Sequence, residues 1–232
     1  MALDLSSLRS VRNFVSEFES LDLPLNLLIN NAGKFPQAHA ISEDGIEMTF
    51  ATNYLGHFLL TKLLMEKMTE TARRCGVQGR IVNVTSHTHG WFSGDVVGCI
   101  GQISRSKREF EPTRAYVLSK LANVLNTMEV ARRLKETGAN VTANCVHPGI
   151  VKTRLTRERE GFLTDLAFLV SRRFLKTIPQ AAATTCYVAT HPSLRNVSGK
   201  YFVDCNEAPT SKMGSDPDEA ARLWWASEIM VD

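Results

Sequence analysis

Apolar runs of strand length alternate with helical patterns along this chain, and this alternation restricts the fold more than any other feature. The clearest runs lie at 25–31, 80–85 and 141–147, and a helical stretch precedes each of them. Strands that alternate with helices form βαβ units, which build a parallel sheet covered on both faces. We therefore predict an α/β fold, a Rossmann-like doubly wound parallel sheet, in a single domain over 1–232.

The expected helices run from about Leu8 to Glu19, Asp44 to Arg74, Thr113 to Glu136 and Pro179 to His191, and a last strand is expected at 199–204. The stretch from His87 to Pro112 is the least regular and carries glycines at 90, 94, 98 and 101. These glycines lack the Gly-x-Gly-x-x-Gly spacing of a dinucleotide fingerprint. We interpret this stretch as a variable loop over a substrate.

Composition and residue spacing exclude several classes of function for this chain. A formal net charge of +3 is too slight to indicate a nucleic-acid partner. The five cysteines are odd in number and lack metal or redox spacing, which favours free thiols inside a cell, in a reducing compartment. No apolar run approaches the ~20 residues that span a bilayer. His87 and His89 have no carboxylate or cysteine at ligand spacing, so no metal site is predicted.

Tyr116 and Lys120 lie four residues apart in an expected helix, so they share one of its faces. A phenol has an ordinary pKa of about 10, and a cation within ~4–6 Å favours its ionised form. We therefore expect Lys120 to lower the pKa of Tyr116 and so to form an acid/base pair with it. One such pair arises readily by chance, so the interpretation depends on further residues.

Further motifs surround this pair in a particular order. Ser86 closes the run 80–85, where open α/β sheets collect their ligands. The other motif residues are Asn31, Ala32 and Gly33, then Asn53, and finally Pro148, Gly149, Val151 and Thr153. Together these motifs resemble those of the short-chain dehydrogenase/reductase family. The resemblance is strongest to its retinol-dehydrogenase-like branch, and within that branch to plant members named after the chloroplast inner-envelope translocon.

The resemblance implies a catalytic set and a cofactor. Tyr116 would exchange the substrate proton, Ser86 would bind the same substrate oxygen, Lys120 would tune the tyrosine and bind the ribose, and Asn53 would hold a water. The implied cofactor is NADP, with NAD left open. Cofactor contacts are expected from Asp4, Asn31, Ala32, Gly33, Tyr116, Lys120, Pro148, Gly149, Val151 and Thr153.

Plainer interpretations of three residues stay open. Asn53 is also compatible with a helix amide satisfied by backbone, Ser86 with a strand-end cap, and Asp4 with a helix N-cap. The segment 152–176 is basic with an apolar centre, and occupies the family's substrate-loop position. Contact between this segment and a membrane surface or a regulatory partner is the alternative. Formation of a homo-oligomer is also left open.

The family's first strands and its glycine-rich turn have no counterpart in this sequence, so we expect an N-terminally truncated fold. The strand at 25–31 then becomes a sheet edge that is prone to pairing, and the helix at 8–19 is expected to dock loosely. The predicted function is hydride transfer between nicotinamide and a small apolar alcohol, aldehyde or ketone. The alternative is a catalytically silent fragment that acts only by binding partners. A chloroplast-envelope location follows from the resemblance alone.

Overall fold

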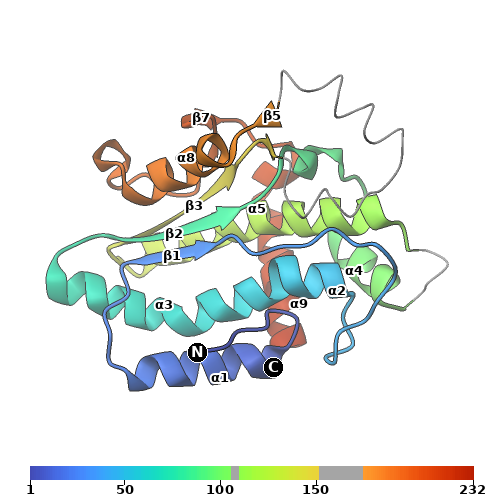
Figure 1. Ribbon diagram of the computed structural model, residues 1–232, viewed down its shortest axis with the longest axis horizontal. Helices are drawn as coiled ribbons and strands as arrows, with labels where there is room; N and C mark the ends of the chain where they lie inside the picture. The colour runs from blue at the N-terminus through green and yellow to red at the C-terminus, as the bar shows by residue number, and fades with distance from the viewer. Residues whose placement is uncertain (106–109, 152–174) are drawn as a thin grey trace.

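The computed structural model describes residues 1–105, 110–151 and 175–232. Its centre is a sheet of β1 (Leu27–Asn30), β2 (Gly79–Val84), β3 (Val141–His147), β6 (Tyr201–Val203) and β7 (Asn206–Ala208), in the order β1-β2-β3-β6-β7. The first four strands are parallel and β7 is antiparallel to β6 (Figure 1). The predicted α/β parallel sheet is therefore confirmed, and β7 is an addition that we did not predict.

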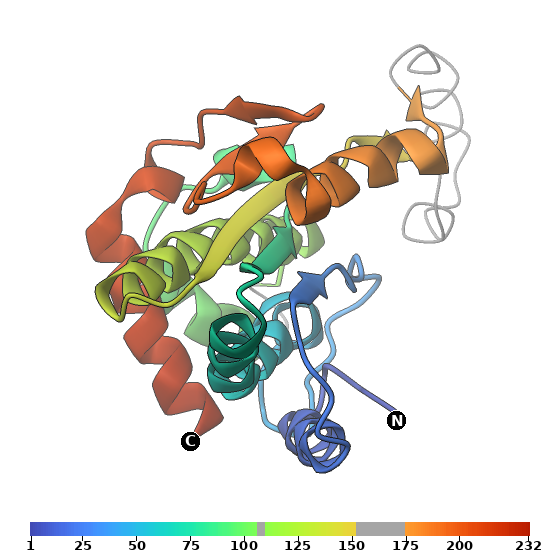
Figure 2. The same cartoon turned by 90° about the vertical axis from the view of Figure 1, so that its left-hand side faces the viewer.

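Helices cover both faces of this sheet. On one face lie α3 (Gly56–Cys75) and α5 (Pro112–Glu136), with α1 (Leu8–Ser20) outside α3 and α9 (Pro217–Val231) outside α5. On the other face, α8 (Ile178–Thr190) packs on β2, β3 and β6 (Figure 2). Short elements complete the described part: β4 (Ile150–Val151) pairs with β5 (Leu175–Lys176), and the 3-10 helices η4 and η5 are Pro192–Leu194 and Met213–Ser215.

The second predicted helix is divided into three parts. A short helix α2 (Met48–Phe50) leads into a π-helical turn η1 (Ala51–Leu55), and α3 then continues to Cys75. Glu47 caps the start of α2, because its Oε2 accepts a hydrogen bond from the Phe50 amide at 2.8 Å. Insertions of this kind in helices frequently lie at functional sites.

The expected loop from His87 to Pro112 is only partly a loop. It holds a 3-10 helix η2 (His87–Trp91) and a helix α4 (Val96–Arg105). Val96, Cys99, Ile100 and Ile103 follow the i, i+3, i+4, i+7 pattern of a buried helix face, and all four are buried. The glycines obscured this pattern, so the prediction of a loop was wrong at α4.

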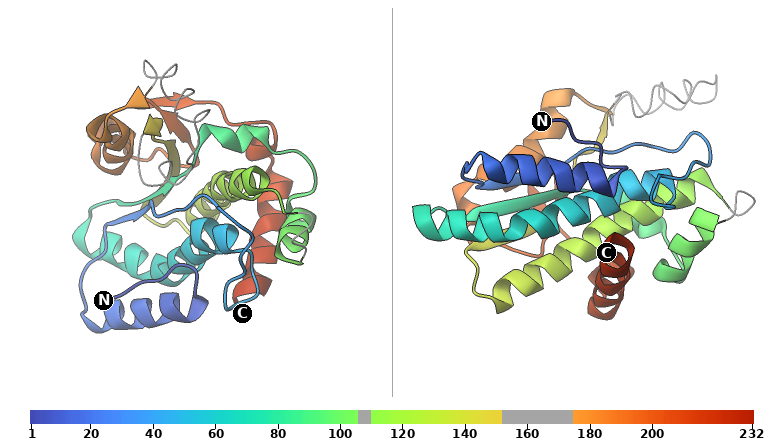
Figure 3. Two further views of the ribbon diagram at one scale, coloured as in Figure 1. Left: turned by 45° about the vertical axis from the view of Figure 1, so that its right-hand side comes forward. Right: turned by 90° about the horizontal axis from the view of Figure 1, so that it is seen from below.

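The helix α1 docks firmly, which corrects the expectation of loose docking. It lies alongside α3 (Figure 3), with Val11 fully buried and Val15 nearly so. The Arg12 guanidinium also donates a hydrogen bond to the Val231 carbonyl at the end of α9. This contact ties the first and last helices together.

The strand β1 lies at the edge of the sheet and, within the described residues, pairs only with β2. Leu28 packs on the main core and Asn30 bonds Thr61 of α3, whereas Leu27 and Ile29 alternate to the opposite face of the strand. The last two are 42% and 43% exposed. An apolar strand face is therefore open to solvent beside an open row of backbone donors and acceptors.

Candidate active site

The parallel strands end at one edge of the sheet, and this edge gathers the predicted residues. Ser86 follows β2, Pro148 follows β3, and Asn31 follows β1. The helix α5 brings Tyr116 to the same edge from its first turns. Glu111 caps α5 by accepting hydrogen bonds from the amides of Thr113 and Arg114, at 3.1 and 2.9 Å.

The Ser86 side chain lies beside the Tyr116 hydroxyl. Burial raises the pKa of Tyr116, and the interaction with Ser86 opposes that rise. We had expected Lys120 to lower this pKa; instead, burial raises it, and the opposing contribution comes from Ser86. The ring of Phe35 also packs on the Tyr116 ring, with centroids 5.0 Å apart.

Lys120 lies one turn behind Tyr116 on the same face of α5, as the spacing predicted. Its ammonium is 5.6 Å from the centre of the Tyr116 ring and donates to the Val84 carbonyl at 3.1 Å. The side chain is 5% exposed, and burial lowers its pKa to about 8. The Thr85 hydroxyl donates to the Lys120 carbonyl at 2.6 Å, which joins α5 to the end of β2.

The Asn53 side chain braces the segment that follows β1. Its Oδ1 accepts from the Lys34 amide at 2.7 Å, and its Nδ2 donates to the Lys34 carbonyl at 2.9 Å and to the Ser119 hydroxyl at 3.1 Å. The open interpretation of a satisfied helix amide therefore describes this side chain well. A water-holding role for Asn53 stays a prediction.

The π-helical turn presents the Asn53 carbonyl to two other side chains. Asn123 Nδ2 lies 3.2 Å from this oxygen and His57 Nδ1 lies 3.1 Å from it. Burial lowers the pKa of His57 to about 4, so the ring is neutral and donates from Nδ1. Sequence reasoning missed both residues. Asn123 had a usable signal, because it follows Lys120 by three positions and shares its helix face.

The segment Asn31, Ala32 and Gly33 is exposed, and its last residue lies against the lysine. A Cβ atom on Gly33 would lie 3.2 Å from Asn53 Oδ1 and 3.6 Å from Lys120 Nζ. Only glycine leaves this space free, so backbone groups here are accessible to a ligand that also reaches Lys120. These residues fit a nicotinamide cofactor at this edge.

The second predicted cofactor segment is only partly described. Gly149 has a φ of +93°, a backbone conformation that favours glycine, and the flexible end of the Lys176 side chain lies against it. Pro148 and Val151 are half-buried beside it. Thr153 and most of the basic segment 152–176 lie outside the described residues.

Asp4 is engaged locally, apart from the cluster around Tyr116. Its Oδ1 accepts from the amide and the hydroxyl of Ser6, at 2.9 and 2.7 Å, and these bonds lower its pKa. The N-cap of α1 is Ser7, so the N-cap interpretation of Asp4 was wrong. Asp4 lines an open polar hollow of about 620 Å³ together with residues of α1 and Glu43.

Neither a metal site nor a membrane span is found in the part of the chain that the structure describes. Within 1–105, 110–151 and 175–232, no group of three or more His, Cys, Asp or Glu residues is arranged so that it could hold a metal ion. Over the same ranges, no helix is both long and apolar enough to cross a bilayer.

A parallel α/β sheet with helices on both faces and polar side chains gathered at the carboxyl edge of its strands is the arrangement in which Rossmann-like folds bind their ligands. Residues 1–162 match the family model described as short chain dehydrogenase, and the chain belongs to that family. It is 47% identical to "Short-chain dehydrogenase TIC 32 B, chloroplastic" of Brassica napus, over 100% of this chain and 72% of that protein. It is 42% identical to human "Retinol dehydrogenase 14", over 99% of this chain and 65% of that protein.

Solved structures agree with this assignment. A protein from Mycobacterium paratuberculosis, described as uncharacterized, superposes with a TM-score of 0.71 at 28% identity, over 99% of this chain and 74% of that one. A 4-hydroxyisoleucine dehydrogenase complexed with NADH gives a TM-score of 0.62 at 22% identity, over 88% of this chain and 76% of that one. The second likeness concerns the fold alone.

Proposed function

We propose that this chain is an NAD(P)-dependent oxidoreductase that interconverts small apolar alcohols with aldehydes or ketones, using Tyr116 as its acid/base. The observation that carries the proposal is that Ser86 and the buried ammonium of Lys120 both lie beside Tyr116 at the carboxyl edge of the sheet. When bound, the nicotinamide cofactor supplies or accepts the hydride. Asn31, Ala32, Gly33, Pro148, Gly149, Val151 and Thr153 would hold it, and Asp4 would lie beside its adenine ring.

The chain's own residues account for the movement of the proton. Tyr116 gives a proton to the substrate oxygen during reduction and takes it back during oxidation. Ser86 donates a hydrogen bond to the same oxygen and stabilises the charge that develops on it. A phenol with a raised pKa is a poor base near neutrality, so the ammonium of Lys120 favours the ionised form when Tyr116 must accept a proton.

The apolar substrate is supported by Phe35, whose ring covers one side of Tyr116, and by the name of the human relative. The choice of NADP is an expectation from the family, with NAD as its alternative. A chloroplast location is supported by the names of the Brassica relatives. We further propose that the segment 152–176 contacts a membrane surface or a regulatory partner, and vesicle flotation tests the membrane contact. Formation of a homo-oligomer is also proposed, and size-exclusion chromatography tests it.

The test is an assay of hydride transfer from NADPH and from NADH to a series of aliphatic and isoprenoid aldehydes. Calorimetry measures cofactor affinity in parallel. We expect turnover that increases with apolar chain length and a lower dissociation constant for NADPH. Absence of both turnover and cofactor binding would favour the alternative, a silent protein that acts through partners.

A further inference from the structure

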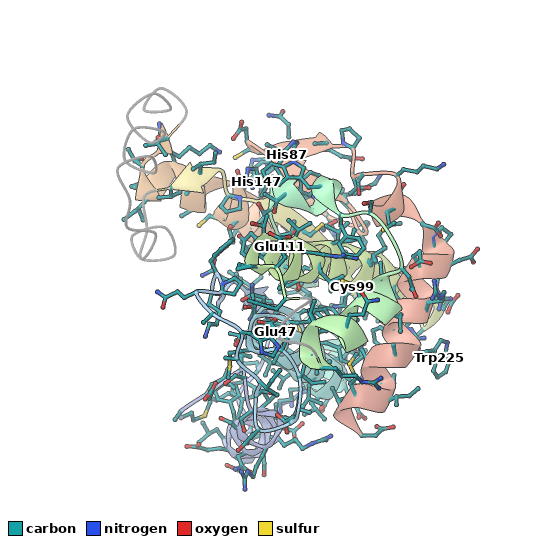
Figure 4. The ribbon with its side chains drawn as sticks, turned by 90° about the vertical axis from the view of Figure 1, so that its right-hand side faces the viewer. Glu47, His87, Cys99, Glu111, His147 and Trp225 are labelled. Atoms are coloured by element: carbon teal, nitrogen blue, oxygen red, sulfur yellow. The ribbon has the colours of Figure 1, made fainter. Side chains whose placement is uncertain are left out.

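Three histidines surround the peptide that follows Ser86, and the mechanism above uses none of them. His87 and His89 belong to η2, and His147 is the last residue of β3. Figure 4 shows His87 and His147 beside one another, from neighbouring elements, and their ring centroids are 6.1 Å apart. We considered His87 and His89 as possible metal ligands on the basis of the sequence. Their positions beside Ser86 indicate a different role.

His89 holds the carbonyl side of the Ser86–His87 peptide. Its Nε2 lies 3.2 Å from the Ser211 amide and accepts that proton, so the ring proton is on Nδ1. Nδ1 lies 2.8 Å from the Ser86 carbonyl oxygen and donates to it. The side chain is 3% exposed, and the Tyr201 ring packs edge-on against it with centroids 5.0 Å apart.

His147 holds the amide side of the same peptide. The His87 N–H donates to His147 Nδ1 at 3.3 Å, so the proton of this ring is on Nε2. The two histidines come from separate elements and bind opposite edges of one peptide plane. That plane determines the ψ angle of Ser86, which is held in an extended conformation with φ −147° and ψ 154°.

We propose that His89 and His147 are positioning residues that lock the Ser86–His87 peptide and thereby keep the Ser86 hydroxyl directed at Tyr116. This inference rests on the proposed function in one respect, namely the role of Ser86 in binding the substrate oxygen. The Ser86 hydroxyl depends on this peptide, because its oxygen accepts from the Thr88 amide at 3.3 Å. A rotated peptide plane would move the Thr88 amide away, and the hydroxyl would then be free to turn away from Tyr116.

The lock requires both rings to be neutral, since a protonated ring would turn each acceptor nitrogen into a donor that faces an N–H. Burial lowers the pKa of His147 to about 4, and the nearby His87, Lys176 and His89 act in the same direction, against Asp204. Burial also lowers the pKa of His89, against its bond to the Ser86 carbonyl. Lys176 and Asp204 form an ion pair with each other. The surroundings of both rings therefore preserve the neutral tautomers.

Variants of His147 separate positioning from simple folding. His147→Asn keeps an acceptor oxygen close to the place of Nδ1, whereas His147→Leu removes the acceptor at similar volume. We expect His147→Leu to lower kcat at least tenfold with the cofactor dissociation constant within threefold, and His147→Asn to restore kcat to within threefold. His191→Leu, an exposed histidine of another element, is the matched control and should leave kcat unchanged.

A second measurement does not depend on turnover. Long-range ¹H–¹⁵N spectra of the full chain should show neutral rings from pH 8 to pH 6, with the proton on Nδ1 of His89 and on Nε2 of His147. The opposite tautomer at His147, or a charged ring at pH 6.5, would overturn the lock. Equal losses in the Leu and Asn variants would also overturn it.

Tyr116→Phe in the same experiments distinguishes the two proposals. Full turnover in Tyr116→Phe would contradict the proposed function. The tautomers of His89 and His147 would still test whether these rings lock the Ser86–His87 peptide. If the chain shows no turnover at all, the ring tautomers decide the lock by themselves. The expected displacement of the His87 amide resonance in His147→Leu would then support it.

Discussion

At the scale of single residues, the site buries the positive charge of Lys120, and this burial opposes folding. Lys120 is nearly fully buried, and its ammonium has the Val84 carbonyl and the Tyr116 ring as neighbours but no carboxylate among its recorded partners. Burial lowers its pKa from the ordinary 10.5 to about 8. A lowering of this size corresponds to about 3 kcal/mol of lost folding free energy at about 1.4 kcal/mol per pKa unit.

Replacing Lys120 with methionine tests this at the level of stability. Below pH 8 both folded and unfolded chains carry the proton, so the buried charge destabilises the wild type. Between about pH 8 and 10 the folded chain releases the proton first, and wild-type stability rises with pH. We expect Lys120→Met to be about 1–3 kcal/mol more stable at pH 7 and nearly equal at pH 10. Urea unfolding at pH 7 and pH 10 measures the difference in free energy of unfolding between Lys120→Met and the wild type. A difference that does not change with pH would contradict this explanation.

Tyr116→Phe tests the chemistry. The change removes the hydroxyl beside Ser86 and leaves the ring contact with Phe35 in place. We expect turnover to fall by roughly 10²–10⁴, because positioned acid/base groups contribute that much, with a melting temperature close to that of the wild type. Tyr187→Phe is the matched control, since its hydroxyl bonds Ser193, away from the site. Near-normal turnover in Tyr116→Phe would rule out the assigned role.

At the scale of elements, the π-helical turn η1 and the helix α5 depend on each other at Asn123. This side chain donates to the Asn53 carbonyl at 3.2 Å and lies 3.5 Å from the Val84 carbonyl, which also receives the Lys120 ammonium. A buried carbonyl that loses its donor is costly, by about 1–3 kcal/mol. One amide therefore supports both the turn and the surroundings of the lysine.

Asn123→Leu should destabilise the fold by about 1–3 kcal/mol and reduce turnover. The cause is the loss of a donor to the Asn53 carbonyl in a region that cannot admit water freely. Asn126→Leu is the control on the same helix, because Asn126 is equally buried and its Oδ1 has no hydrogen-bond partner among the described residues. Denaturant unfolding and kinetics compare the two. A larger loss for Asn126→Leu would show that the polar interior of α5 is organised in another way.

At the scale of the whole molecule, the open edge of the sheet is the weakest feature. Leu27 and Ile29 expose an apolar face on β1, and the described residues provide no second partner for its backbone. Exposed, apolar edge strands pair readily with other chains. The molecule therefore combines a well-packed interior around α3 and α5 with an edge strand, β1, that is prone to pair with other chains.

Leu27→Lys should reduce self-association of the isolated chain, because a charge on an edge strand opposes pairing. Leu21→Lys is the control: Leu21 is also exposed, at 52%, but lies outside the strand. Size-exclusion chromatography and light scattering on warming measure the effect. Equal improvement in both variants would point to general solubility, and a monomeric wild type with a high melting temperature would contradict the prediction.

Much of the fold was predictable because its signals are local and periodic. The strand 141–147 and the helix at 113–136 were predicted almost to the residue, since apolar runs and the turn-to-turn spacing on a helix face need no knowledge of distant residues. For the same reason, Ser86 was expected at a strand end, and Tyr116 and Lys120 on one helix face. The helix α4 carried a readable pattern too, but its glycines concealed it.

The sequence by itself therefore determined the strands at 25–31, 80–85 and 141–147 with the helices that precede them, and the edge of the sheet at which Ser86 and Tyr116 meet. Only the tertiary structure decided how Asn53 is used, that Asn123 supports it, and that His89 and His147 hold one peptide from both sides. The physical reason is that hydrogen bonds have short, directional geometry. His87 and His147 are 60 positions apart, and Asn53 and Asn123 are 70 apart. No periodic pattern in the sequence relates residues that are so far apart along the chain. The packing of α5 and η2 on the sheet decides which of them meet.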